Sequence, residues 1–399
     1  MIKRELYFFI LLIPQFCFGL VEGKLGKIDA TSTLSLTYDS NLFGLNQNEF
    51  SITKKSNSRI ESKDDFVLRF SPVLHFSKDL HLLSFQVSAG AEIARFAFND
   101  SSNYIIPVTN LILDFDETLS LNKRISNNAK VRFSATFDIG QHVGTDLIEA
   151  DLVSYTYLIA GFDVRYNHSP KLAVSTGTNY ELREYQSGSI NSYYNDFSNL
   201  PISSNIFYIY SPKLDLFFNY IYRKSESSSS IGNNGDFITH SYSLGANGSI
   251  SQKLSGRASI GYSNIDFMEP SFDDTNSLIS TISLFLNHNI KTKSQLEISK
   301  TFSPTARSRA QLESKFRYSL SHNLNQHLNS TIGIFYNNSE VFVSNSVSNN
   351  VDQTGFDATL TRIIRPNITT SLSYNFSVVS RNLSKFNKHL LSASIYGRF

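Results

Sequence analysis

The sequence predicts an all-β fold, a single antiparallel up-and-down β-barrel of about 18 strands, with 16 as the alternative count. Two observations predict it. Apolar and polar residues alternate with a period of two through most of the chain, and short polar turns recur at nearly regular intervals. A third observation excludes a helical bundle in a membrane. After residue 20, no apolar run reaches the ~20 residues that a membrane-spanning helix needs.

The alternation is clearest in residues 130–139, and it recurs in 238–250 and 368–378. In the first segment one face carries Val131, Phe133, Ala135, Phe137 and Ile139, and the other carries Lys130, Arg132, Ser134, Thr136 and Asp138. A charged side chain that faces lipid at the bilayer midplane costs about 2–4 kcal/mol. The apolar face is therefore predicted to be the outer one, and the polar face the inner one.

Turn signals divide the chain into pairs of strands. Tight turns are predicted at residues 77–79, 122–124, 168–171, 211–213, 251–253, 289–291, 323–325 and 365–367. Longer loops, rich in Ser, Asn and Gly, are predicted at residues 45–63, 99–106, 186–199, 225–236, 269–276 and 344–350. Eight turns join sixteen strands, and a first strand near residues 31–43 and a closing strand complete eighteen. The short periplasmic turns and the longer extracellular loops lie at opposite ends.

The composition narrows the range of partners. The 36 Lys and Arg residues balance 34 Asp and Glu residues, which argues against a nucleic-acid partner. Hydrophobic residues make up 41% of the chain, and 32 Phe and 20 Tyr raise the aromatic share to 13%. Phe and Tyr favour strands, so this composition suits a sheet surface better than a helical core.

The N-terminus has the pattern of a secretory signal peptide. Lys3 and Arg4 precede a short apolar run, and Gly19 provides a small residue for cleavage. A lipidated Cys17 is the disfavoured alternative, because the residues before it do not suit a lipoprotein box. Cleavage after Gly19 leaves no cysteine, and therefore no disulfide or thiolate site. The predicted organisation is a cleaved signal peptide (1–19), a short periplasmic segment (20–30) and an outer-membrane barrel (31–399).

The final segment alternates as a strand does. Leu391, Ala393, Ile395, Gly397 and Phe399 fall on one face, and Ser392, Ser394, Tyr396 and Arg398 fall on the other. A strand that ends on Phe399 resembles the closing strand of bacterial outer-membrane β-barrels. The resemblance implies that barrel-insertion machinery recognises this strand as an insertion signal. Gly397 departs from the bulky residue that many members have there.

A second resemblance lies near the start of the barrel. The segment Leu36-Thr37-Tyr38-Asp39-Ser40-Asn41-Leu42-Phe43 resembles the opening strand of the family called putative β-barrel porin type 2, with its Tyr-Asp-x-Asn-aliphatic-Phe element. The resemblance implies an outer-membrane barrel of Gram-negative bacteria, in some members associated with exopolysaccharide export. It supplies no catalytic residues.

No motif predicts catalysis, a metal or a cofactor. The nine histidines are scattered, and none has the spacing of a zinc-protease motif. Some outer-membrane enzymes use a Ser-His pair on the outer wall, and His240 is the histidine to examine for that role. No nucleophile elbow accompanies it, so a wet interfacial histidine is the favoured interpretation. We therefore expect that the protein is not an enzyme.

The polar phase of the strands predicts the lining of the lumen. The candidates are Arg69, Glu92, Asp114, Asp116, Lys130, Arg132, Asp138, Asp163, Arg165, Glu181, Arg183, Asp215, Arg223, Arg257, Glu297, Arg309, Glu313, Lys315, Arg317 and Asp357. These charges either filter solutes or pair across neighbouring strands, and the mixture of signs favours pairing for most of them. Arg309, Lys315 and Arg317 form the best candidate cluster for an anion preference.

The predicted function is a passive or weakly selective outer-membrane pore for small hydrophilic solutes. The alternatives are an exopolysaccharide export conduit and a structural or adhesin-like barrel with a closed lumen. The expected partners are outer-membrane lipid and lipopolysaccharide, the insertion machinery, and small hydrophilic solutes or polysaccharide. A barrel of 16 to 18 strands is wide enough for a water-filled lumen unless loops fold inward.

Overall fold

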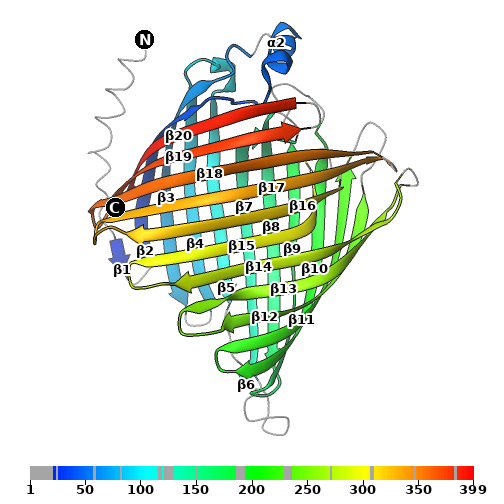
Figure 1. The fold of residues 1–399 in the computed structure, drawn as a ribbon. Coiled ribbons are helices and arrows are strands. Elements are labelled where there is room, and N and C mark those ends of the chain that lie inside the picture. The colour runs from blue at the N-terminus through cyan, green and yellow to red at the C-terminus, as the bar shows by residue number, and fades with distance from the viewer. Residues whose placement is uncertain are drawn as a thin grey trace.

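The protein forms one antiparallel β-sheet that closes on itself, as the computed structural model shows (Figure 1). The structure describes residues 21–23, 26–56, 60–80, 83–115, 119–120, 130–148, 151–185, 194–228, 236–269, 272–305, 310–344, 347–381 and 384–399. No helix in this part of the chain is long and apolar enough to cross a membrane.

The first half of the sheet is built from β2 (Gly26–Asp39), β3 (Asp65–Leu80), β4 (Leu83–Phe96), β5 (Tyr104–Phe115), β7 (Lys130–Asp146), β8 (Asp151–Asn167), β9 (Leu172–Tyr185), β10 (Asp196–Ser211) and β11 (Leu214–Ser228). The second half is built from β12 (Phe237–Ser249), β13 (Leu254–Phe267), β14 (Thr275–Asn287), β15 (Thr292–Pro304), β16 (Ala310–Asn323), β17 (Leu328–Ser344), β18 (Val347–Arg365), β19 (Ile368–Arg381) and β20 (Ser384–Arg398). The short elements are β1 (Val21–Gly23), β6 (Leu119–Ser120), the helix α2 (Gln47–Ser56) and the 3₁₀ helix η2 (Asp100–Ser102).

Each long strand pairs with its neighbours in sequence, and the last strand returns to the first. β2 pairs with β20 from Thr31 opposite Arg398 to Asp39 opposite Leu390, and it also pairs with β3. β5 and β6 both pair with β7 and occupy one position in the sheet, while β1 pairs only with β2. The described residues therefore form a closed barrel of eighteen strand positions, which confirms the predicted architecture. Closure leaves no long sheet edge unpaired.

The alternation along each strand separates an apolar outer face from a polar inner face. On β12, the side chain of Leu244 is 64% exposed on the outer face, whereas its neighbour Ser243 lines an internal cavity. Ile260 on β13 and Leu278 on β14 continue the outer apolar surface. Because successive residues of a strand point to opposite sides, these placements also give the directions of the remaining side chains along the same strands.

The tight turns share a small hydrogen-bonded motif. In the turn that follows β8, the Ser169 hydroxyl accepts hydrogen bonds from the backbone N–H groups of Lys171 and Leu172. In the turn that follows β14, the side-chain oxygen of Asn289 accepts hydrogen bonds from the N–H groups of Lys291 and Thr292. Ser and Asn are favoured in such turns because their side chains replace a backbone acceptor.

Several expected boundaries differ from the structure, including those of the expected loop 45–63, which contains the helix α2. Residues 77–79 lie within β3, so the first turn comes later than predicted. Residues 344–350 were expected to be a loop, but β17 ends at Ser344 and β18 begins at Val347. The reason is that the inner wall of a water-filled barrel is polar, so Ser- and Asn-rich strands resemble loops in composition. The first barrel strand begins at Gly26 and ends at Asp39, earlier than the expected range 31–43. The predicted turn at 122–124 lies outside the described residues.

Candidate functional site

Three chain segments at the loop end of the barrel fold inward instead of projecting outward. The first is the connection between β2 and β3. Its residues Leu42, Phe43 and Leu45 are almost fully buried and pack in a cluster with Val67 and Phe96 of the barrel wall. Such burial of apolar side chains stabilises an inward loop conformation. The helix α2 follows and lies over this end of the barrel (Figure 1).

The loop end of the β7–β8 hairpin is the second inward segment. Leu147 and Ile148 pack against Val351, Val379 and Phe386, which belong to β18, β19 and β20. Four strand positions, β2 to β5, separate β7 from β20 along the sheet, so this contact crosses the interior.

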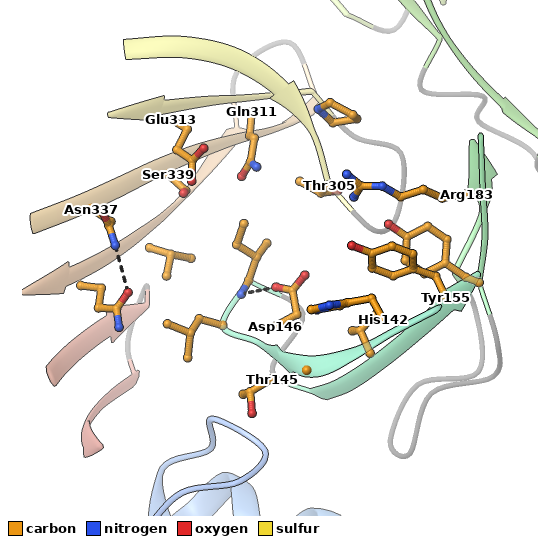
Figure 2. Close-up of a pocket in the computed structure, with 18 residues that line it drawn as sticks. His142, Thr145, Asp146, Tyr155, Arg183, Thr305, Gln311, Glu313, Asn337 and Ser339 are labelled. Atoms are coloured by element: carbon orange, nitrogen blue, oxygen red, sulfur yellow. Dashed lines mark hydrogen bonds between the residues drawn. The ribbon is translucent and has the colours of Figure 1, made fainter. Parts of the chain in front are cut away.

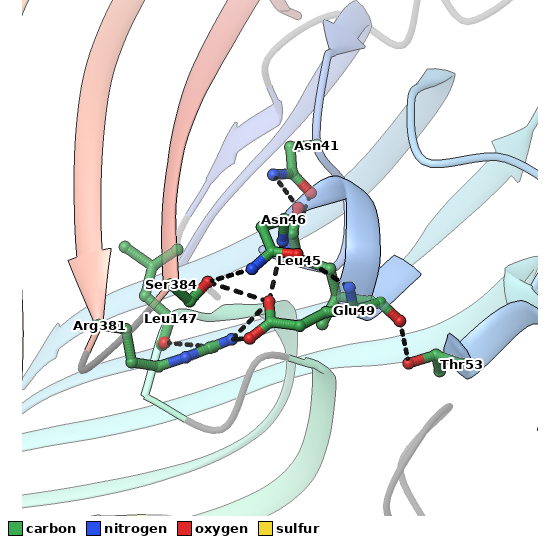
Figure 3. A network of polar contacts seen from close by, with 8 residues as sticks. All are labelled: Asn41, Leu45, Asn46, Glu49, Thr53, Leu147, Arg381 and Ser384. Atoms are coloured by element: carbon green, nitrogen blue, oxygen red, sulfur yellow. Dashed lines mark hydrogen bonds and ion pairs between the residues drawn. The ribbon is translucent and has the colours of Figure 1, made fainter. Parts of the chain in front are cut away.

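Hydrogen bonds fasten the same end of the β7–β8 hairpin. The Thr145 hydroxyl donates to the Leu42 carbonyl at 2.6 Å, which joins the first two inward segments. The Arg381 guanidinium donates to the Leu147 carbonyl at 3.3 Å (Figure 3). These bonds satisfy backbone carbonyls that the inward fold removes from bulk water.

The third inward segment is the loop end of the β15–β16 hairpin. The pairing of β15 with β14 ends at Lys300, although β14 continues to Thr275 alongside β13. Beyond Lys300, the side chain of Phe302 is buried against Phe237 and Ile265. The hairpin therefore leaves the wall and bends over the inner faces of β12 and β13.

The second and third segments border a cavity of about 360 Å³ inside the loop end of the barrel (Figure 2), and the first segment is joined to the second by the Thr145–Leu42 hydrogen bond. One side of the cavity is aromatic and basic. The Arg183 guanidinium lies 4.9 Å from the ring centroid of Tyr155 and 5.0 Å from that of Phe197, and it forms a 2.6 Å ion pair with Glu181. The His142 ring lies 5.1 Å from the Tyr155 ring. Cation–π contact and the ion pair both fix the Arg183 side chain in the lumen wall.

The opposite side of the cavity carries amides and hydroxyls from β16, β17 and β18. The Asn337 amide donates to the Gln353 side-chain oxygen at 3.2 Å, and the Gln311 amide donates to the Ser303 hydroxyl at 3.0 Å. Glu313 also lines this side, and its carboxylate is paired with Lys315 at 2.7 Å. The cavity is therefore polar on this side, and its carboxylate is neutralised by an adjacent amine.

The cluster proposed for an anion preference has carboxylate partners. Lys315 pairs with Glu313, and Arg317 pairs with Asp357 at 2.9 Å. Paired charges of this kind offer little uncompensated field to a passing anion. Arg309 lies outside the described residues.

Other predicted lining residues also pair across strands. Arg69 and Glu92 approach to 3.9 Å, and the Tyr104 hydroxyl donates to Glu92 at 2.6 Å. Arg165 pairs with Asp215 at 3.7 Å. The first pair joins the neighbouring strands β3 and β4, and the second reaches from β8 to β11. Both follow the structural alternative, in which strands satisfy one another's charges.

The remaining predicted residues fall into three groups. Asp138 stands on the inner phase of β7 opposite Ile159, and Arg257 lines a second cavity on the inner face of β11 to β15. For Asp114, Lys130 and Arg132 only the backbone pairing is described, and they lie opposite Ser84, Asn167 and Arg165 respectively. Asp116 lies outside the described residues.

The sequence reasoning missed most residues of the cavity in Figure 2. His142, Tyr155, Gln311 and Asn337 line it, yet none was selected, because the selection used only Asp, Glu, Lys and Arg. The available signal was the alternation itself, which places His142 on the same phase as Asp138. The histidine examined for a Ser-His pair, His240, instead contacts the Tyr220 hydroxyl at 2.9 Å.

The chain matches the sequence profile of the family described as "Putative beta-barrel porin 2" over residues 47–397. No curated protein matches the sequence. Among solved structures, Pseudomonas aeruginosa OpdQ is similar, with 9% identity, a TM-score of 0.49, and coverage of 93% of this chain and 98% of that chain. Acinetobacter baumannii OccAB4 has 12% identity, a TM-score of 0.43, and coverage of 93% and 98%. Pseudomonas aeruginosa OpdK with vanillate has 10% identity, a TM-score of 0.49, and coverage of 96% and 100%.

A closed barrel with an apolar outer face, a polar inner face and a narrowed interior defines an outer-membrane pore protein. The family profile covers most of the chain, and the chain belongs to the Putative beta-barrel porin 2 family. The protein is accordingly an integral outer-membrane porin, a pore for small solutes in contact with membrane lipid.

Proposed function

We propose that solutes cross this porin through the cavity of Figure 2, with selection by size and only weak selection by charge. The observation that carries the proposal is the inward fold of the β7–β8 and β15–β16 hairpin ends onto one polar cavity of about 360 Å³. Of the charged groups that border it, Arg183 and Glu313 are each bound to a neighbour of opposite charge, and the Asp146 carboxylate accepts a hydrogen bond from the backbone N–H of Ile148. Hydrogen-bonding side chains can then replace part of the hydration of a small hydrophilic solute as it passes.

The test is conductance in planar bilayers, together with liposome swelling in neutral sugars of graded size. The expected result is a steady current, passage of monosaccharides and exclusion of long oligosaccharides. Absence of a steady current would support the alternative of a closed structural barrel. Free passage of long oligosaccharides would support an export conduit for polysaccharide. Either outcome contradicts the proposed size filter.

We propose further that the protein has no enzymatic activity. Tyr155, Arg183 and Glu313 are held by neighbouring side chains, which suits a fixed lining better than a reacting group. On the outer face, His240 lies against Tyr220 and Tyr222. Incubation of the purified barrel with phospholipid and lipopolysaccharide is expected to release no fatty acid, and release that is lost in the His240→Ala variant contradicts this.

Two proposals concern biogenesis. Residues 1–19, which lie outside the described part, are proposed to be removed as a signal peptide, and N-terminal sequencing of protein from outer membranes tests this. The strand β20 is proposed to be the segment that the barrel-insertion machinery recognises, since it presents Leu391 and Ile395 outward and pairs with β2 at the point of closure. Cross-linking from Phe399 to that machinery during assembly is the expected observation.

A further inference from the structure

We propose that the second cavity, on the inner face of β11 to β15, binds an oxyanion group carried by a solute, such as a phosphate, sulfate or carboxylate. This cavity has a volume of about 210 Å³, and Arg223 and Arg257 both line it. The inference deepens the proposed pore function, because the cavity opens on the same lumen. The inference assigns solutes with an oxyanion group to this second cavity. The cavity of Figure 2, with its paired charges, does not select that class.

Arg257 is the main contact for the oxyanion. Its guanidinium carbon lies 4.3 Å from the ring centroid of Phe217, so one face of the group is stacked on an aromatic ring. Within the described part of the chain, no carboxylate lies within ion-pair distance of Arg257. Stacking uses the flat face of a guanidinium and leaves the N–H groups on its rim available for a planar or tetrahedral anion.

Arg223 adds a second positive charge that has no carboxylate partner among the described residues. One of its terminal nitrogens donates to the Phe302 carbonyl at 2.7 Å, which holds the β15–β16 hairpin over the cavity. Its Nε is buried and has no hydrogen-bond partner among the described residues, and no carboxylate there pairs with it. Glu181, on β9, is bound to Arg183 at 2.6 Å. A buried cation without a partner is costly, and a bound anion offsets that cost.

The register separates the two arginines along the wall. Arg223 lies opposite Thr239 of β12, and Arg257 lies opposite Asn247 of the same strand. These positions are eight residues apart (247 − 239), or about 26 Å at ~3.3 Å per residue before the long side chains shorten the gap. The arginines therefore mark the two ends of the cavity, and a small anion meets them one at a time.

Hydroxyl groups line the cavity between its two ends. Ser241, Ser243, Ser259 and Thr281 all contribute to the lining. A hydroxyl donates one hydrogen bond and can rotate to suit an oxyanion in several positions. The combination of hydroxyls with two cations that lack carboxylate partners favours an oxyanion over a metal cation, which would need carboxylate or carbonyl ligands.

A matched arrangement on the neighbouring wall provides the control. Arg165 is stacked on Phe207 at 4.6 Å, as Arg257 is stacked on Phe217, but Arg165 also pairs with Asp215 at 3.7 Å. The two stacked arginines therefore differ in whether a carboxylate neutralises them. Replacing Arg165 together with Asp215 removes a stacked arginine without changing the net charge of the lumen.

The experiment measures the binding of inorganic phosphate to the purified barrel in an uncharged detergent, by ³¹P line broadening over a phosphate titration. We expect saturable binding by the natural protein and affinity at least about tenfold lower in Arg257→Gln, the order expected for loss of one charge-assisted hydrogen bond. Arg223→Gln is expected to weaken binding to a smaller extent. The double variant Arg165→Gln/Asp215→Asn is expected to bind as the natural protein does, and heat-dependent gel mobility checks the fold of each variant.

Three results would overturn the proposal: no saturable binding, unchanged affinity in Arg257→Gln, or an equal loss in the double control variant. The assay does not depend on current. A barrel that conducts ions but does not bind phosphate contradicts the oxyanion site alone. A barrel that binds phosphate but passes no current contradicts the proposed solute route alone.

Discussion

Glu49 connects the first inward segment to the barrel wall by two different contacts. Its carboxylate accepts the Asn46 backbone N–H at 2.9 Å, and its own N–H donates to the Asn46 side chain at 2.8 Å, which is a capping box at the start of α2. The same carboxylate accepts two hydrogen bonds from Arg381 at 3.1 Å (Figure 3). One residue therefore starts the helix and attaches it to β19.

The attachment of α2 is expected to weaken in acid. Burial alone would raise the pKa of Glu49, but the hydrogen bond from Asn46 and the charge of Arg381 outweigh it, and the pKa lies below the ordinary 4.5. Stabilisation from a lowered carboxyl pKa is complete above the unfolded value and is lost as the pH falls through the folded value. The protection of α2 amides, taken as the ratio of the intrinsic to the observed exchange rate, should therefore be constant above about pH 4.5 and fall below it.

The Glu49→Gln variant separates the two contacts, because glutamine retains the capping box and removes the charge. Its α2 protection is expected to be lower at neutral pH and to lack the acid-dependent decrease. An unchanged acid-dependent decrease of protection in this variant would assign the titration to another group.

Among the described residues, a buried ion pair joins Lys388 of β20 to Asp39 of β2. Their atoms lie 2.9 Å apart, and the two side chains are only 7% and 8% exposed. Lys388→Met leaves a buried carboxylate without its partner, and it should lower the free energy of unfolding by about 3 kcal/mol. Adding Asp39→Asn should recover much of that loss. Urea unfolding of the barrel in lipid vesicles is the measurement, and equal stability of the single and double variants would contradict the prediction.

At this scale the sequence predicted the phase of charged residues but not their partners. The alternation assigned Lys315 and Arg317 to one face, yet the partner of Arg317, Asp357, is forty positions away in sequence. Partner identity depends on the register between strands, which a single strand does not encode. For the same reason, the sequence did not show that Arg257 has no carboxylate partner among the described residues.

At the scale of elements, the inward β15–β16 hairpin distinguishes this barrel from an open tube. It is held by the burial of Phe302 and by the Arg223 hydrogen bond to the Phe302 carbonyl. The sequence could not predict this bend, because it depends on contacts with Phe237 and Ile265, which belong to other hairpins. Local alternation continues through Phe302 and predicts an ordinary strand there.

Shortening this hairpin should widen the pore. Replacing residues 303–311 with a two-residue Asn-Gly turn removes the segment that borders the cavity of Figure 2 on one side. We expect single-channel conductance to rise by roughly twofold or more, with passage of larger neutral sugars, since the narrowest part of a pore limits flux. Replacing residues 268–274 of the β13–β14 loop with the same two-residue turn is the control and should leave conductance unchanged. Unchanged conductance in the first variant would place the narrow part elsewhere.

The overall architecture of the molecule was the part of the structure that the sequence predicted best. A period of two, the polar turns and the need to keep charge out of lipid together predicted eighteen strands and the direction of each face. The errors were in segments such as 344–350, where a hydrophilic inner wall and a loop have the same composition. The size of the opening could not be predicted, because it is set by segments that leave the wall.

The two faces of β12 offer a direct test of orientation. Leu244→Arg places a charge on the lipid-facing side near the middle of the strand, and it should lower stability in vesicles by about 2–4 kcal/mol. Ser243→Arg places the same charge one residue away, on the lumen side, and should lower stability by less than Leu244→Arg does. Urea unfolding in vesicles compares the two variants, and equal losses would contradict the assigned faces.

The pair Lys388–Asp39 lies where the first and last strands meet, and the Lys388 amine also donates to the Asn41 carbonyl and to Thr145. The same ammonium group therefore stabilises the junction of the first and last strands and the segments that narrow the passage. During assembly, the width of the passage is therefore not fixed until the first and last strands have paired. A half-closed intermediate should leak more than the finished protein does.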